Sequence, residues 1–499
     1  MPRHSTNNAP PPRLPASAHF IGIGGIGMSS IAAAFAWMGV RVSGSDRKLD
    51  GENESGGDKI LDALRRLGIR LFPQDGSFAK FHEPEILVRS SAIEPGNPDA
   101  EAAEKVPAIH RSEALNAFLA ANQDKTSIAV CGTSGKTTTT AWLAETLHMM
   151  GEDPVVIGGG IALRFENSRG STGNFKPGKG KFIVFEADES DKSLAAYAPN
   201  AAVLLNMGSD HHPLPELAEI FSRFLNTAET RVIQANAAAE LANLNHPSNP
   251  NIVFHDGPPP ETQRPPYPDQ ACWNVEKYVA GNTLLRRTST DSEKTELFHI
   301  TSPVPGRHSA SNAMAVMATI DALGLDLQAA ARNIPLFKGV WRRFNRLGTS
   351  PSGAAVIDDY AHNPEKIAAC LNAARETIPA NSKIIAIFQP HGFKPLAFMK
   401  NTLLEALEAT LRPNDAFAFL PVHYAGGSAA FTPTSKEVVE EFSAKGRGQY
   451  LALDSREEAK LFVEKTAARD DAVLVMGARD DSLANLAETF VACQKRNES

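Results

Sequence analysis

Residues 130–138 of this chain read Val130-Cys131-Gly132-Thr133-Ser134-Gly135-Lys136-Thr137-Thr138. A strand-like run (127–131) enters this glycine turn, and a helix-like run (138–149) leaves it. In that layout the backbone N–H groups and the helix N-terminus face an anion, and the lysine adds a positive charge. The pattern predicts a loop that binds the phosphates of a nucleoside triphosphate, formed by Gly132, Thr133, Gly135, Lys136, Thr137 and Thr138.

The loop departs from the general pattern at Val130, where a glycine six residues before the lysine is usual. The shorter form G-T-x-G-K-T is intact. The hydroxyl of Thr137 suits the Mg²⁺ that accompanies nucleotide phosphates. The alternative is a chance glycine turn before a helix, which the order of strand, loop and helix disfavours.

Length and composition narrow the class of protein. With 499 residues the chain is too long for one core, so two to four domains are expected. A formal charge of -7 argues against nucleic acid as the main partner, since such proteins usually carry a basic face. The four cysteines lie far apart without a C-x-x-C pair, which is typical of a reducing cytoplasm. No apolar run approaches the ~18 residues that span a bilayer, so a cytoplasmic protein without membrane insertion is expected.

Strand-like apolar runs alternate with helical patterns along the chain, which predicts an α/β protein with parallel sheets. The polar, proline-rich residues 1–15 are expected to form a disordered tail. Changes in composition then indicate a first domain at 16–122, a central phosphate-loop domain at 123–302 and a third domain at 303–499. Residues 164–180 are rich in Gly, Ser and Lys without periodicity, which predicts a mobile loop beside the phosphate site.

A second glycine motif, Gly22-Ile23-Gly24-Gly25-Ile26-Gly27, lies between a predicted strand and helix, and Asp46 ends the next strand. This G-x-G-x-x-G pattern suits NAD as well as any nucleoside diphosphate, and a purely structural turn is the other interpretation. Two phosphate motifs in one chain favour an enzyme that uses ATP on a substrate carrying a nucleoside diphosphate. An NAD-dependent oxidoreductase is the rival hypothesis, although it would not need the phosphate loop.

Acidic residues follow the predicted strand at 181–186, beginning with Glu186. His211 follows the predicted strand at 201–206 in the same way. Carboxylates at the carboxyl end of a strand beside a phosphate loop suit Mg²⁺ or Mn²⁺ better than zinc. A solvated acidic turn is the alternative interpretation.

The third domain carries polar clusters at strand-to-helix turns, where ligands collect in open parallel sheets. His308 precedes a helix that carries Asn312. Arg342 and Arg343 form a pair that suits clamping of phosphate or carboxylate, although a basic surface patch is the other interpretation. Two neighbouring turns hold the further candidates Asp359, Tyr360, His362, His391 and Lys394.

In chain order the motifs are G-I-G-G-I-G-M, S-G-S-D, S-S-A-I, G-T-S-G-K-T-T-T, E-A-D-E-S-D, D-H, P-G-R-H-x-x-x-N, R-R-F-N, D-D-Y-A-H-N-P and F-Q-P-H. Over residues 18–483 this combination resembles the Mur ligases, and most closely the branch that adds L-alanine to UDP-N-acetylmuramate. The resemblance implies three domains: a Rossmann-like UDP-binding domain, a central ATPase domain and a C-terminal Rossmann-like domain. It also implies that ATP phosphorylates the muramyl carboxylate and that an amine displaces the phosphate, in peptidoglycan precursor synthesis.

The resemblance assigns roles by motif. Gly24, Gly25, Gly27, Asp46 and Ser91 bind the UDP substrate. Thr137, Glu186 and His211 hold Mg²⁺. His308 and Asn312 line the adenine side of ATP, and Tyr360, His391 and Lys394 face the acceptor. Lys136, Arg343, Asp359 and His362 are the catalytic residues.

One departure from the motifs of the L-alanine branch leaves the identity of the acceptor open. The L-alanine branch usually has Arg-Tyr-Thr after F-Q-P-H, and this chain has Gly392-Phe393-Lys394. Alternatives to L-alanine are another amino acid or a peptide, as in the recycling ligase that attaches a tripeptide. A non-catalytic Mur-like nucleotide-binding protein is a third hypothesis. The oligomeric state does not follow from the sequence.

Overall fold

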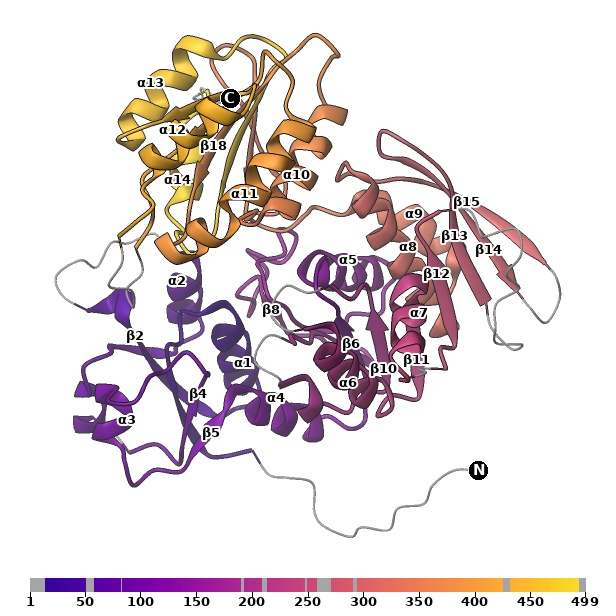
Figure 1. Ribbon diagram of the computed structural model, residues 1–499. Helices are drawn as coiled ribbons and strands as arrows, with labels where there is room; N and C mark the ends of the chain where they lie inside the picture. The colour runs from indigo at the N-terminus through magenta and orange to yellow at the C-terminus, as the bar shows by residue number, and fades with distance from the viewer. Residues whose placement is uncertain are drawn as a thin grey trace, which may run out of the picture. The chain divides into compact units, whose positions relative to one another are not determined.

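The computed structural model describes residues 14–50, 58–81, 83–189, 193–208, 213–246, 249–257, 271–289, 294–424 and 431–492. The chain forms two compact units (Figure 1). The first comprises Met1–Lys277, Thr283–Thr301 and Ser311–Lys338, and the second Tyr278–Asn282, Ser302–Ala310 and Gly339–Ser499. No helix in the described ranges has the length and apolarity needed to cross a membrane.

The first unit opens with a five-stranded parallel sheet in the order β3-β2-β1-β4-β5. Its strands are β1 (Ser17–Ile21), β2 (Arg41–Asp46), β3 (Arg70–Pro73), β4 (Ile86–Arg89) and β5 (Ala108–His110). Its helices are α1 (Ile26–Trp37), α2 (Lys59–Arg66), α3 (Pro98–Ala102) and α4 (Arg111–Ala120), with short 3₁₀ turns at η1 (Arg47–Leu49) and η2 (Ser77–Lys80). The strand order reverses at β1, so ligands are expected at the carboxyl ends of β1 and β4.

A ten-stranded sheet follows in the same unit, in the order β15-β14-β13-β12-β11-β10-β6-β9-β7-β8. Its strands are β6 (Thr126–Cys131), β7 (Val155–Ile157), β8 (Phe175–Lys176), β9 (Phe182–Glu186), β10 (Ala201–Leu204), β11 (Thr230–Gln234), β12 (Ile252–His255), β13 (Ala271–Val279), β14 (Asn282–Ser289) and β15 (Thr295–Thr301). The accompanying helices are α5 (Lys136–Met149), η3 (Ser193–Ala196), α6 (Leu214–Leu225), α7 (Ala235–Asn243), α8 (Arg307–Ala322), α9 (Leu327–Asn333) and η4 (Ile334–Leu336). Strand β6, buried from Ser127 to Cys131, pairs in parallel with β9 and β10, so the polar residues after all three strands share one edge.

Residues 164–180 differ from the mobile loop expected from the sequence. Strand β8 lies in this segment and pairs antiparallel with β7. The side chain of Asn174 is fully buried and donates to Ile26 O at 2.7 Å and to Ser29 Oγ at 2.8 Å. The segment lacks periodicity because hydrogen bonds to α1 hold it in place rather than an amphipathic face.

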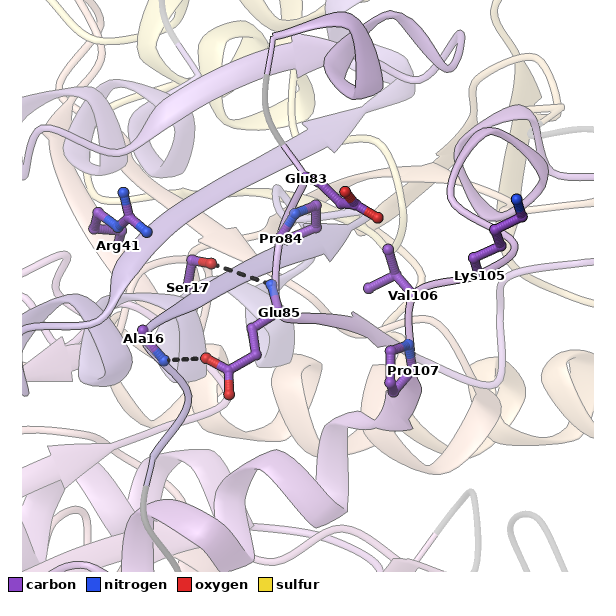
Figure 2. Close-up of a pocket in the computed structure, with 9 residues that line it drawn as sticks. All are labelled: Ala16, Ser17, Arg41, Glu83, Pro84, Glu85, Lys105, Val106 and Pro107. Carbon is purple, nitrogen blue, oxygen red and sulfur yellow. Dashed lines mark hydrogen bonds between the residues drawn. The ribbon is translucent and has the colours of Figure 1, made fainter.

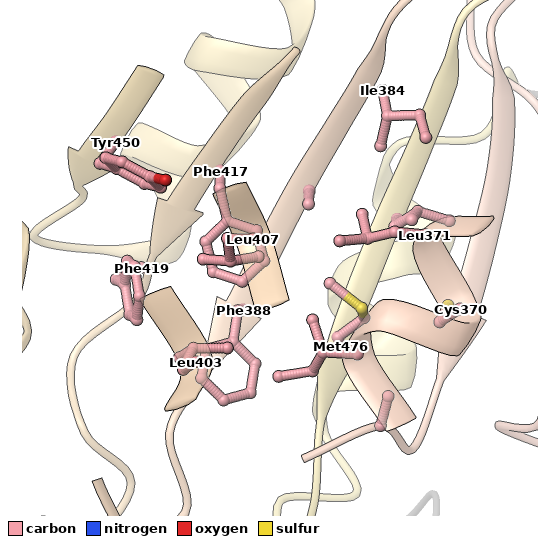
Figure 3. Packing of buried hydrophobic residues seen from close by; sticks show 14 of the residues in the cluster. Cys370, Leu371, Ile384, Phe388, Leu403, Leu407, Phe417, Phe419, Tyr450 and Met476 are labelled. Carbon is pink, nitrogen blue, oxygen red and sulfur yellow. The ribbon is translucent and has the colours of Figure 1, made fainter. Parts of the chain in front are cut away.

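The second unit has a six-stranded sheet in the order β16-β17-β21-β18-β19-β20, parallel except for β16. Its strands are β16 (Asn345–Thr349), β17 (Ala355–Asp359), β18 (Ile384–Gln389), β19 (Ala416–Phe419), β20 (Gln449–Ala452) and β21 (Ala472–Gly477). Its helices are α10 (Pro364–Glu376), α11 (Phe393–Thr410), α12 (Ser435–Lys445), α13 (Arg456–Thr466) and α14 (Leu483–Thr489). Alternate strand residues feed two apolar cores, and Figure 3 shows Phe388, Phe417 and Phe419 packed with Leu403 and Leu407 of α11 in one of them. The predicted α/β class is confirmed by three successive sheets whose central strands are parallel, two of them within the first unit.

Candidate active site

The first glycine loop lies at the carboxyl end of β1. Gly22 N and Ile23 N donate to Ser45 O at 2.8 and 2.9 Å, and Gly24 N donates to Asp46 Oδ2 at 2.8 Å. A Cβ on Gly24 would lie 2.8 Å from that oxygen, so a side chain does not fit there. Asp46, predicted to lie near a uridine, thus also fixes the shape of the loop.

The remaining predicted UDP-binding residues share this edge of the sheet. Gly25 is the N-cap of α1, makes no side-chain cap, and is followed by a first turn without acidic residues. The positive end of α1 therefore faces the loop, as an anion site requires. Gly27 lies in that first turn, and Ser91 follows β4 across the switch point.

The phosphate loop joins β6 to α5, as predicted. Gly132 and Gly135 have φ values of 128° and 84°, which residues other than glycine rarely adopt. A Cβ on Gly135 would lie 2.7 Å from Asn312 Oδ1, so the loop packs against α8 at that residue. The structure thus places Asn312, predicted to line the adenine side, beside the loop.

Asn206 clamps this loop, and the sequence interpretation missed it. Its Oδ1 accepts from Ser134 N at 2.8 Å, and its Nδ2 donates to Ser134 O at 2.9 Å. Its carbonyl accepts from Thr133 N at 3.4 Å. The available signal was an amide at the carboxyl end of a strand predicted to lie in the same sheet as the loop.

Lys136 lies among carboxylates. Its Nζ is 2.9 Å from Glu189 Oε2 and 3.5 Å from Asp188 Oδ1. Burial by itself lowers the pKa of Lys136, but Glu189, Asp188 and Glu186 outweigh that effect and raise the pKa. The lysine is therefore charged at neutral pH, as binding of phosphate requires.

Two of the three predicted metal ligands lie together. Thr137 Oγ1 donates to Glu186 Oε1 at 3.1 Å, while Gly159 N donates to Glu186 Oε2 at 2.8 Å. A hydroxyl and a carboxylate beside a phosphate loop fit the oxygen ligands that Mg²⁺ prefers. His211 lies outside the described residues, and within those residues no three His, Cys, Asp or Glu side chains gather as metal ligands. Magnesium binding therefore stays a prediction.

In the second unit, the adjacent arginines lie in different surroundings. Arg342 is buried, and its Nε lies 3.4 Å from Asp358 Oδ1. It also donates to the carbonyl of Gly477, which ends β21, at 2.7 Å and to that of Asp480 at 3.0 Å. Arg343 is only half-buried, and its guanidinium lies 4.9 Å from the ring centroid of Tyr360. Of the two, Arg343 has the placement that ligand binding needs.

Both carboxylate oxygens of Asp359 accept hydrogen bonds from backbone N–H groups. They accept from Phe344 N at 2.6 Å and from Ala361 N at 2.7 Å. Burial raises the pKa of Asp359, although the charge of Arg343 and these hydrogen bonds oppose the rise. Asp359 thus fixes the turns that carry Arg343 and His362, and its catalytic role stays a prediction.

The rings of His362 and His391 meet edge to face, with centroids 5.2 Å apart. His362 Nδ1 lies 2.9 Å from Tyr360 O, whereas the buried Nδ1 of His391 has no hydrogen-bond partner in the part of the chain that the structure describes. Burial, with nearby positive charge adding to it, lowers the pKa of each imidazole to about 4. Both rings are therefore neutral at pH 7. A neutral imidazole has one nitrogen with a free lone pair, so His391 can accept a hydrogen bond from an N–H group.

These pKa values predict a titration measurable by NMR. The ring C–H signals of His362 and His391 are expected to stay unshifted from pH 8 to about pH 5.5, with assignments from His362→Gln and His391→Gln. Because each pKa is lower in the folded than in the unfolded chain, folding should lose stability as pH falls from about 6.5 to about 4. The two variants should lose less over that window, and a midpoint near 6.5 for either ring would contradict the prediction.

The two remaining predicted residues lie in the second unit. His308 packs under Gly306, where a Cβ would meet its Cε1 at 2.5 Å, and burial lowers the pKa of His308. Lys394 lies in the first turn of α11, three residues after His391.

Family models match three successive parts of the chain. The catalytic domain of the Mur ligase family matches residues 17–123, the Mur ligase middle domain matches 130–320 and the glutamate ligase domain of Mur ligases matches 342–479. The UDP-N-acetylmuramate–L-alanine ligase of Sinorhizobium fredii is 33% identical over 479 residues, which cover 94% of this chain and 95% of the relative. The chain belongs to the Mur ligase family. A relative of the same name from a Cyanothece species is 32% identical and covers 92% of each chain.

Solved structures of Mur ligases agree with the fold. The UDP-N-acetylmuramate-alanine ligase of Thermotoga maritima superposes with a TM-score of 0.74 at 26% identity, covering 95% of this chain and 98% of that one. A murein peptide ligase from Psychrobacter arcticus has a TM-score of 0.64 at 21% identity, covering 95% and 99%, and shares the fold.

The first unit of this Mur ligase also has a hollow of about 450 Å³, and Figure 2 shows the residues that line it. Arg41 and Ser17, which begin β2 and β1, line it together with Glu85 and Lys105. Glu85 N donates to Ser17 Oγ at 3.1 Å. The hollow is therefore at the amino ends of the strands, opposite the edge where the site residues gather.

Proposed function

We propose that this Mur ligase joins an amino acid to UDP-N-acetylmuramate at the expense of ATP, in peptidoglycan precursor synthesis. The observation that carries the proposal is the pair of glycine loops in one unit, each at the carboxyl end of a central strand and each followed by the N-terminus of a helix. The names of the full-length relatives support the substrate pair. The proposal includes a cytoplasmic location and domains at 16–122, 123–302 and 303–499.

The proposed reaction has two steps. The muramyl carboxylate attacks the γ-phosphorus of ATP, which forms an acyl phosphate and releases ADP. The amine of the acceptor then attacks the acyl carbon, and the C–O bond to phosphate breaks as the amide forms. Lys136 binds the phosphates, while Thr137 and Glu186 would hold Mg²⁺, which neutralises phosphate charge when bound.

The acceptor side is assigned to the carboxyl edge of the sheet in the second unit. Tyr360, His362 and His391 lie together there, and the neutral imidazole of His391 is suited to accept an N–H from the acceptor amine. L-alanine is the proposed acceptor. A bulkier acceptor is the second candidate, because Phe393 packs against the exposed Tyr424 and Phe431 beside this edge, with tilted and edge-to-face rings at centroid distances of 6.3 and 5.5 Å.

The test is phosphate release by the purified protein with ATP, Mg²⁺ and UDP-N-acetylmuramate, against a panel of amino acids and the peptidoglycan tripeptide, with products analysed by mass spectrometry. We expect release that depends on L-alanine and a product heavier by one alanyl residue. Release with another acceptor alone would reject L-alanine and keep the ligase. No release with any acceptor, despite nucleotide binding, would favour a non-catalytic protein.

A further inference from the structure

Arg111 is a residue that neither motif identified. It begins α4 directly after β5, so it lies at the same carboxyl edge as the first glycine loop. Its helix is capped by His110 and Glu113 in a reciprocal capping box, so the guanidinium is not needed to satisfy the helix end. The side chain is only 20% exposed, and this burial of a charge requires an anionic neighbour.

The guanidinium lies against the first glycine loop. A Cβ built on Gly27 would be 2.7 Å from Arg111 Nη1, so the loop leaves room for this side chain only because residue 27 is glycine. The cation thus stands at the N-terminus of α1, where the helix dipole is also positive. The guanidinium and the positive helix end repel each other unless an anion lies between them.

An anion reaches Arg111 from the central sheet. Asp188 Oδ2 is 3.6 Å from Arg111 Nη2, and Asp188 Oδ1 is 3.5 Å from Lys136 Nζ. Asp188 therefore shares its charge between the first glycine loop and the lysine of the phosphate loop. Arg111, Asp188 and Lys136 all belong to the first unit.

We propose that Arg111 binds the diphosphate of the nucleotide sugar and that Asp188 holds the same guanidinium while the sugar site is empty. The inference rests on the proposed function, since it assumes a nucleoside diphosphate on the first glycine loop. A diphosphate there offers several charged oxygens where Asp188 offers two, and arginine pairs with phosphate in a bidentate manner. Arg111 is thus a substrate-binding residue, and Asp188 competes with the substrate for its guanidinium.

If Arg111 exchanges Asp188 for the diphosphate, substitutions of Arg111 and of Asp188 should change the affinity for the nucleotide in opposite directions. Isothermal titration calorimetry with UDP and UDP-N-acetylmuramate, without ATP, measures these changes directly. Arg111→Met is expected to weaken binding about 10- to 100-fold, the value of a charge-assisted hydrogen bond, and Arg111→Lys to restore part of it. Asp188→Asn is expected to tighten binding about two- to fivefold, because it removes the competitor.

The double variant tests the exchange itself. In the Arg111→Met background, Asp188→Asn should no longer tighten binding, whereas independent roles would give additive effects. Arg223→Met and Glu219→Gln, which break an exposed ion pair on α6 of the same unit, are the matched controls and should change nothing.

The outcomes separate this inference from the proposed function. Wild-type protein that binds neither UDP nor the nucleotide sugar would overturn both. Binding that is unchanged or weakened by Asp188→Asn would overturn the exchange and leave the ligase standing. Weakened binding with Arg111→Met that arises from misfolding would show in its thermal unfolding, and Arg111→Lys would then give the deciding measurement.

Discussion

Lys136→Ala is expected to lower the ATP-dependent turnover of this Mur ligase about 10²- to 10³-fold or more, the cost of removing one preorganised charge from developing negative charge. Lys136 is 13% exposed and stands at the N-terminus of α5, so no other cation on that helix's first turn replaces it. The first glycine loop lies on a separate sheet, and its geometry depends on Ser45 and Asp46. Binding of UDP-N-acetylmuramate should therefore stay nearly intact.

Phosphate release measures the turnover, and calorimetry with the nucleotide sugar measures the binding. Lys181→Ala is the matched control, because Lys181 is 59% exposed and faces Glu152 at 3.8 Å near the start of β9. It should leave both quantities unchanged. If Lys136→Ala removed nucleotide-sugar binding as well, with thermal unfolding unaltered, the two sites would not be separate.

The sequence predicted those parts of the site that short-range patterns encode. Both glycine loops occur between the strand and the helix that the periodicity indicated, because the turn, the cap and the phosphate cradle all lie within a few residues. Thr137 and Glu186 also meet as predicted, since parallel neighbouring strands bring their carboxyl ends to one edge.

The sequence did not predict contacts that depend on packing between distant segments. Asn206 is 72 residues from Ser134, and no local pattern marks its amide as the clamp of the phosphate loop. Residues 164–180 resemble a loop in composition, yet Asn174 is buried because it bonds to α1, 145 or more residues earlier. Arg111 begins a helix, which is a common position, and only the close approach of Gly27 shows its surroundings.

The arginines Arg342 and Arg343 show the same limit most directly, because they are adjacent in the sequence and their burial differs. Arg342 and Phe344 have φ values of 57° and 45°, in the left-handed region that side chains other than glycine rarely adopt. The backbone thus reverses on both sides of Arg343. Arg342 is buried at 2% exposure, whereas Arg343 is half-buried, although both guanidinium groups lie over the ring of Tyr360, at 5.2 and 4.9 Å from its centroid.

Arg342→Met is therefore expected to lower the free energy of unfolding of the second unit by about 3–5 kcal/mol, because Asp358 is left buried without its cation. Burial raises the pKa of Asp358 to about 6, and Arg342 opposes that rise. Without Arg342 the folded chain should hold the proton of Asp358 to still higher pH than the unfolded chain does. The stability lost should therefore grow as pH rises from 5 to 8. Arg342→Met with Asp358→Asn should recover part of the loss, as denaturant unfolding at the two pH values would measure.

Arg343→Met is expected to have the opposite profile. Its side chain is half-buried over an aromatic ring, so the loss of the cation–π contact should lower the free energy of unfolding by about 1 kcal/mol. Loss of its attraction to the buried Asp359 should add to this, but the backbone hydrogen bonds of Asp359 remain, so the total should stay below the loss in Arg342→Met. If Arg343 neutralises the transferred phosphoryl group, turnover should fall about 100-fold or more, and Arg343→Lys should restore only part of it, because an ammonium lacks the bidentate fork. Equal stability losses for Arg342→Met and Arg343→Met would show that the left-handed turn does not separate their roles. Unaltered turnover in Arg343→Met would assign the phosphoryl contact to another cation.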